Sequence, residues 1–153
     1  MIVAFRLVDA KFADDVYSGE GARLFGGRWN KKGHRVVYTA DTVSLATLEL
    51  IVTTPRAQRL RDYVVSSCAF SRELVEEIDV ARLPENWRDY PAPPELREIG
   101  TTWLLNGSSA VLSVPSAVIP NQRNYLLNPE HPDFSTIHMN PATPFQLDFR
   151  LLT

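Results

Sequence analysis

Residues 42–54 constrain the fold most, because their only ionisable side chain, the carboxylate of Glu49, lies among apolar neighbours. Asp41 or Thr42 can cap the start of a helix here, and Pro55 follows its end. At 100° per residue Glu49 shares a stripe that should face the core with Leu45, Leu48 and Val52. An inward carboxylate is unfavourable without compensation. The pattern predicts either a structural arginine beside Glu49 or a pocket that uses its charge.

A glycine-rich segment precedes this helix. Residues 17–32 hold four of the seven glycines of the chain and are predicted to form a shaped loop rather than a regular element. The loop contains the sequence Gly-Gly-Arg-Trp-Asn, with its arginine at position 28, and a strand-like run ending near Tyr38 follows it. Loops of this length in a compact domain are often functional.

The rest of the chain alternates short apolar runs with turn residues, and prolines at positions 91, 93 and 94 exclude regular structure until about residue 95. This mixture predicts an α+β fold, a single domain over residues 1–153 built on a twisted, mainly antiparallel sheet with a few helices. Strand order is left open. The predicted strands are 2–7, 35–40, 63–70, 110–114, 117–119, 125–127 and 144–151, and the predicted helical stretches after the first are 72–78 and 95–105.

The composition of the chain argues against several classes of function and site. With 16 Lys and Arg against 18 Asp and Glu, the net charge is −2, so direct binding of nucleic acid is not expected. The single cysteine excludes an internal disulfide, and three isolated histidines argue against a metal site. No leader peptide and no run of about 20 apolar residues is found, so we expect a cytoplasmic protein without membrane contact or bound cofactor.

Four polar residues are candidates for chemistry: Arg28, Tyr38, Glu49 and Ser116. Each has a structural alternative. The arginine can form a surface ion pair, the tyrosine can be a core aromatic, the glutamate can be neutralised by an arginine, and the serine can close a turn after Pro115.

Two long segments, GARLFGGRWNKKGHRVVYTADTVSLATLE and VPSAVIPNQRNYLLNPEHPDF, together resemble the RES-domain family, named for its arginine, glutamate and serine. The resemblance implies a fold similar to ADP-ribosyltransferase toxins and an activity that breaks down NAD+, with protein ADP-ribosylation in some members. It implies a catalytic set of Arg28, Tyr38, Glu49 and a serine in the tail. Ser116 matches the Val-Pro-Ser position, and Ser113 lies close to it.

These residue types suit cleavage of the ribose–nicotinamide bond. Glu49 would stabilise positive charge that develops on the ribose. Arg28 and Arg6 would bind the pyrophosphate, and Gly27 would let the backbone approach it. Trp29 and Asn124 complete the expected substrate-binding set. Tyr38 would pack on the nicotinamide or its ribose, and the site serine would donate a hydrogen bond.

Several alternatives stay open at this stage. The reaction can be hydrolysis or phosphorolysis of NAD+, or mono-ADP-ribosylation of a protein, and a non-enzymatic nucleotide- or antitoxin-binding module is also possible. The family implies a partner, an Xre-like antitoxin with a DNA-binding domain. Apolar residues within 145–151 could support a homo-oligomer.

Overall fold

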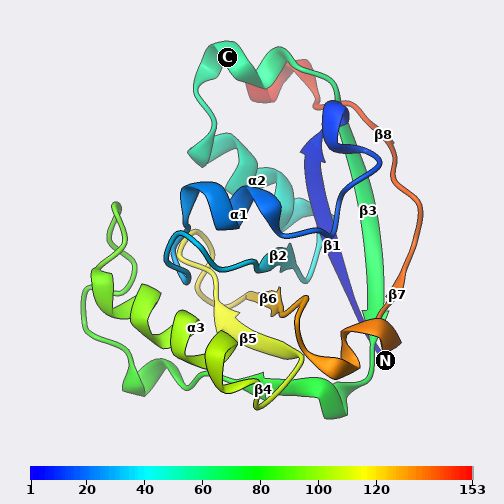
Figure 1. The fold of residues 1–153 in the computed structure, drawn as a ribbon. Coiled ribbons are helices and arrows are strands. Elements are labelled where there is room, and N and C mark those ends of the chain that lie inside the picture. Colours follow the sequence, from blue (N-terminus) through cyan, green and yellow to red (C-terminus); the bar gives the residue numbers. More distant parts are fainter. Residues whose placement is uncertain (153) are drawn as a thin grey trace.

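A computed structural model describes residues 1–152, so the last residue of the predicted 1–153 domain lies outside the described range. Figure 1 shows a strongly twisted sheet with helices beside it. The strands are β1 (Ile2–Asp9), β2 (Val37–Ala40), β3 (Tyr63–Phe70), β4 (Val75–Glu77), β5 (Val111–Pro115), β6 (Arg123–Leu127), β7 (His138–Met139) and β8 (Thr143–Phe145). The α-helices of the described range are α1 (Glu20–Phe25), α2 (Val43–Thr53) and α3 (Pro94–Asn106).

The sheet has the order β4-β5-β6-β2-β1-β3-β7, and β8 also pairs with β3. The β4–β5 pair is parallel, and the other pairings between described strands are antiparallel. The predicted α+β class with a twisted, mainly antiparallel sheet is therefore confirmed. In Figure 1, β1 and β3 run at a steep angle to β5 and β4, which reflects the accumulated twist.

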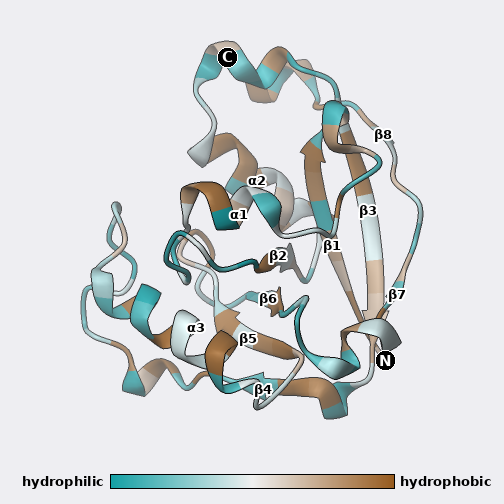
Figure 2. Cartoon of the chain, viewed as in Figure 1, coloured by the Kyte–Doolittle hydropathy of each residue, from teal (hydrophilic) through white to brown (hydrophobic). Residues whose placement is uncertain are grey.

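Apolar cores lie on both faces of the central strands. Val111 of β5 packs in one core with Leu127 of β6, while Leu112 packs in another with Leu126 and Trp103. Successive side chains of a strand point to opposite faces. This explains why every residue of β5 is buried and why the strand is largely hydrophobic in Figure 2.

Helix α2 begins as predicted, since the Thr42 hydroxyl accepts a hydrogen bond from the Leu45 amide at 3.0 Å. The predicted stripe is only partly correct. Leu45 is buried at 1 % exposure, but Leu48 is 39 % and Val52 is 62 % exposed. Residues 45 and 47 are the buried positions of α2, so the sheet covers a narrower side of the helix than the apolar sequence suggests.

The prediction of a loop over 17–32 was wrong for its centre, where α1 forms. Gly19 and Gly26 flank this helix with positive φ, and an ion pair between Glu20 and Arg23 bridges one of its turns. Two glycines therefore act as helix ends, where a left-handed backbone is needed, rather than as loop interior.

Three other predicted elements differ in the structure. Residues 72–78 form a 3₁₀ turn and then β4, which pairs with β5 instead of continuing as a helix. Residues 117–119 form a turn between β5 and β6 rather than a strand, because the Ser116 hydroxyl accepts the amides of residues 118 and 119. The strand predicted at 144–151 is limited to β8, followed by a 3₁₀ helix at Phe149–Leu152. No helix in the described range combines the length and apolar character required to cross a bilayer.

Helix α3 contacts the glycine-rich segment backbone directly. A Cβ atom added at Gly100 would lie 1.8 Å from the carbonyl oxygen of Trp29. At the next residue of α3, the Thr101 hydroxyl accepts a hydrogen bond from the Lys31 amide at 3.0 Å. The missing side chain at position 100 is therefore what lets α3 position this segment.

We predict that Gly100→Ala destabilises the protein by about 1–3 kcal/mol or more, because the new methyl group meets backbone that cannot move independently. Urea denaturation measures the change. Gly21→Ala is the matched control, since it also lies in a helix but its Cβ would meet nothing within 4 Å. A Gly100→Ala protein as stable as the Gly21→Ala protein would contradict the described contact.

Candidate active site

A cavity of about 1450 Å³ lies between α1, α2, β1 and β2 and the segments that precede α3 and β2. It exceeds the roughly 300–1000 Å³ typical of small-ligand pockets, so it has room for an extended ligand. The predicted site residues that line it are Arg6, Gly27, Arg28, Trp29, Tyr38, Glu49 and Asn124. The fold therefore brings residues from four separate parts of the chain to one cavity.

Glu49 projects from α2 toward the β5–β6 hairpin. Its Oε2 accepts a hydrogen bond from the Ser116 hydroxyl at 2.9 Å, and its Oε1 accepts one from the Asn124 amide nitrogen, also at 2.9 Å. Both donors are neutral, and Glu49 forms no ion pair with any described residue. The alternative in which a structural arginine neutralises Glu49 is therefore wrong for the described residues.

The surroundings of Glu49 shift the pKa of its carboxyl. Burial raises the pKa of this carboxyl, the hydrogen bonds from Asn124 and Ser116 lower it, and the nearby charge of Asp41 raises it again. The overall shift is upward from 4.5. Perturbed pKa values of this kind are common where a carboxylate is used chemically.

Of the two candidate serines, Ser116 is the one that contacts Glu49. Ser116 is fully buried and contacts Glu49, and it also accepts the amides of the turn, so the turn and the site use the same hydroxyl. Ser113 accepts a hydrogen bond from Arg123 at 2.8 Å. Ser113 lies within β5, and neither hydrogen bond to the Glu49 carboxylate comes from it.

The segment leading into β2 is held by a buried asparagine. The Tyr38 hydroxyl donates to Asn30 Oδ1 at 2.6 Å and accepts the Trp29 amide at 3.0 Å. The amide nitrogen of Asn30 donates to the carbonyl of Ala22 at 2.9 Å. A Cβ at Gly27 would lie 2.7 Å from the Tyr38 hydroxyl oxygen, so glycine is required for this approach.

Burial raises the pKa of Tyr38, so its hydroxyl stays protonated. Trp29, which was expected to bind substrate, is only 2 % exposed and packs in the core with Trp87 and Trp103. The Trp29 side chain therefore anchors the glycine-rich segment to the core and does not present its ring to a ligand.

Arg28 extends across the cavity to the segment before α3. Its guanidinium donates to the carbonyls of Trp87 at 2.9 Å and Asp89 at 3.1 Å. It does not pair with Glu49, so the arrangement in which these two residues neutralise each other in the empty site is absent. Arg6 donates to the carbonyls of Val16 and Tyr38 at 2.7 and 2.9 Å, and burial lowers its pKa.

Positive charge surrounds the single carboxylate of the cavity. Among the lining residues Glu49 is the only acid, while the basic residues are Arg6, Arg28, Lys31, Lys32, Arg88 and Arg97. Of these, only Lys31 forms an ion pair with a described residue, Glu98. The cavity therefore suits a ligand with several negative charges and one centre that becomes positive, although the whole chain is slightly acidic.

Sequence patterns did not identify Asn30, Arg88 and Arg97 as part of this site. Asn30 stands two positions after Arg28 in the glycine-rich motif, and its 0 % exposure could not be inferred from that position. Arg88 precedes the prolines at 91–94 in a segment without periodicity, so nothing indicated that its guanidinium would reach the Ala117 carbonyl beside Ser116.

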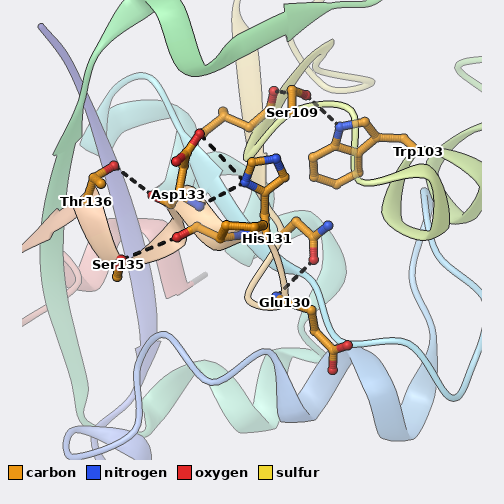
Figure 3. A network of polar contacts seen from close by, with 10 residues as sticks. Trp103, Ser109, Glu130, His131, Asp133, Ser135 and Thr136 are labelled. Carbon is orange, nitrogen blue, oxygen red and sulfur yellow. Dashed lines mark hydrogen bonds and ion pairs between the residues drawn. The ribbon is translucent and has the colours of Figure 1, made fainter.

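His131 lies in a separate polar network, shown in Figure 3. Its Nδ1 accepts the Asp133 amide at 3.0 Å, and Thr136 donates to the Asp133 carbonyl at 2.7 Å. The network also contains the hydrogen bond from Trp103 to Ser109 at 2.8 Å. Within residues 1–152 no three His, Cys, Asp or Glu side chains gather as a metal site would require.

The chain is similar in sequence to known proteins over most of its length. A model of the RES domain matches residues 3–148. A Yersinia enterocolitica protein named Toxin Res is 37 % identical over 135 residues, which cover 88 % of this chain and 89 % of that protein. A Photorhabdus laumondii Toxin Res is 36 % identical over 149 residues, 97 % and 93 % of the two chains. A Sphingobium protein named Prs ADP-ribosylating toxin is 35 % identical over 144 residues, 92 % and 88 % of the two chains.

The fold also matches a solved structure, the crystal structure of the M. tuberculosis MbcT–MbcA toxin–antitoxin complex. The TM-score is 0.78 at 17 % identity, with 94 % of this chain and 84 % of that chain covered. At this identity the likeness concerns the fold. The match over residues 3–148 and the identities to the toxins confirm the resemblance found in the sequence: the chain belongs to the RES domain family.

Proposed function

We propose that this protein is the toxin of a bacterial toxin–antitoxin pair and that it cleaves the ribose–nicotinamide bond of NAD+ by hydrolysis or phosphorolysis. The observation that carries the proposal is one carboxylate, Glu49, held by neutral donors in a cavity whose other charged lining residues are all basic. NAD+ combines the two features that such a cavity suits, an anionic pyrophosphate and a ribose that becomes positive as nicotinamide leaves.

In the proposed reaction the bond between ribose C1′ and the nicotinamide nitrogen breaks, and its electron pair moves onto the nitrogen. Nicotinamide leaves as a neutral molecule, so no acid is required to protonate it. The ionised carboxylate of Glu49 stabilises the positive ribose and orients the attacking oxygen of water or phosphate. That oxygen bonds to C1′, and in hydrolysis the attacking water loses one of its two protons, which passes to solvent, so that ADP-ribose carries the remaining hydroxyl.

The basic residues would hold the rest of the substrate. Arg28 presents a planar, permanently charged group suited to a pyrophosphate, and Arg6 lies in the wall of the same cavity without an acidic partner in the described range. Ser116 and Asn124 would keep the carboxylate of Glu49 oriented while the ligand binds. Tyr38 would contribute its ring, since both hydrogen bonds of its hydroxyl are used within the protein.

A second candidate function is mono-ADP-ribosylation of a protein. It is favoured by the Sphingobium relative, whose name describes an ADP-ribosylating toxin. The same Glu49 chemistry would serve, with a side chain of the target replacing water or phosphate as acceptor. The non-enzymatic alternative predicts that NAD+ stays intact.

We also propose an antitoxin partner for this chain, by analogy with the MbcT–MbcA complex that shares the fold. An Xre-like antitoxin with a DNA-binding domain is the partner expected from the family. Formation of a homo-oligomer stays a prediction; Phe149 and Leu151, within the apolar segment concerned, are 74 % and 40 % exposed.

We predict that the purified protein releases nicotinamide from NAD+ and that Glu49→Gln lowers the rate by at least about a hundredfold, because it removes the charge that stabilises the transition state. Chromatography of NAD+ incubated with and without phosphate measures the loss and identifies the second product. ADP-ribose would indicate water as acceptor, and its phosphorylated form would indicate phosphate.

Glu73→Gln is the matched control, since Glu73 is exposed on the 3₁₀ turn after β3 and does not line the cavity. Intact NAD+ in every buffer, with folded protein free of antitoxin, would contradict NAD+ cleavage. If a target protein became labelled with ADP-ribose under the same conditions, the second candidate function would replace the first.

We predict an acidic limb in the pH profile of kcat/KM that lies above the ordinary pKa of glutamate, because burial raises the pKa of Glu49 and the reaction requires its ionised form. Asn124→Ala removes a donor that stabilises the ionised carboxylate and should move this limb to higher pH. Asn121→Ala, at an exposed turn position, should leave it unchanged. A limb that moves to lower pH in Asn124→Ala would contradict the assigned hydrogen bond.

A further inference from the structure

Two aromatic side chains line the cavity while remaining largely open to solvent. Phe25, the last residue of α1, is 78 % exposed, and Tyr90, in the segment before α3, is 86 % exposed. Isolated exposed aromatics are ordinary on protein surfaces. These two belong to the wall of the same cavity, so a bound ligand can reach both.

Arg28 lies near both of these aromatic residues. Phe25 precedes it by three positions, and Tyr90 directly follows Asp89, whose carbonyl accepts the Arg28 guanidinium at 3.1 Å. Both Glu49 and Tyr90 lie close enough to Arg28 to interact with it electrostatically. In Figure 1 the end of α1 and the segment that enters α3 both lie on the side of the molecule away from β1 and β3.

The cavity therefore presents three kinds of group: the Glu49 carboxylate, the Arg28 guanidinium, and two exposed aromatic side chains that flank Arg28 and its contact residue Asp89 in the sequence. NAD+ presents a group suited to each of them: the nicotinamide ribose, the pyrophosphate, and adenosine. Adenine is a flat, uncharged ring, and such rings bind by stacking on aromatic side chains.

We infer that Phe25 and Tyr90 form the subsite on which the adenine ring of NAD+ stacks. The inference rests on the proposed function and extends it to substrate selection. A dinucleotide engages this subsite, whereas nicotinamide mononucleotide, which has the same scissile bond but lacks the adenylate half, does not. The protein should therefore prefer NAD+ to nicotinamide mononucleotide through binding rather than through the chemical step.

Calorimetric titration of NAD+ and of nicotinamide mononucleotide into Glu49→Gln protein tests the subsite without turnover. Phe25→Ala and Tyr90→Ala, each added to that protein, should raise the Kd of NAD+ by about tenfold and leave that of the mononucleotide unchanged. Tyr90→Phe should retain tight NAD+ binding, because the ring is kept. Leu24→Ala is the matched control, since Leu24 is 53 % exposed on the same helix but does not line the cavity.

Unchanged NAD+ affinity in both alanine variants would overturn the subsite, and so would an equal loss of affinity for the two ligands. Because both aromatic residues are exposed, their truncation should not unfold the protein, and thermal denaturation checks this. Failure of the Glu49→Gln protein to bind NAD+ at all would instead contradict the proposed function, and the inference with it. The two failures are thereby distinguishable.

Discussion

The hydrogen bonds from Ser116 and Asn124 to the two oxygens of Glu49 join α2 to the β5–β6 hairpin. They give each oxygen of this partly buried carboxylate a hydrogen-bond donor. Because both donors are neutral, they do not cancel the charge of the ionised form. An arginine in their place would stabilise the ionised form more strongly but would also occupy the charge that the proposed reaction uses. The contacts that orient Glu49 therefore leave its negative charge directed at a cavity lined by basic residues.

The opposite wall of the cavity depends on a second buried polar group. Asn30 has no exposed surface, and its amide joins the Tyr38 hydroxyl to the backbone around α1. Gly100 lets α3 press against the same segment, and Arg28 extends from it to the chain before α3. A network in which every polar group has a partner holds the segment in a single conformation. The position of Arg28 therefore depends on the buried contacts of Asn30 and Gly100, on the side of the segment away from the Arg28 side chain.

Local patterns predicted the parts of the site that depend on regular elements. The capped apolar helix placed Glu49, and the run of β-prone residues at 63–70 matches β3. The exposure of Leu48 and Val52 depends on how far the curved sheet covers α2, and no pattern within the helix encodes that. The roles of Arg88 and Tyr90 depend on an irregular segment held by long-range hydrogen bonds to backbone carbonyls, which leave no periodic trace in the sequence.

The most direct test of the account is a crystal structure of Glu49→Gln protein with NAD+ bound. The account predicts that the nicotinamide ribose hydroxyls lie within hydrogen-bond distance of residue 49 and that the pyrophosphate contacts the guanidinium of Arg28. NAD+ bound with its ribose remote from residue 49, or outside this cavity, would contradict the assignment of Glu49 as the carboxylate that acts on the ribose.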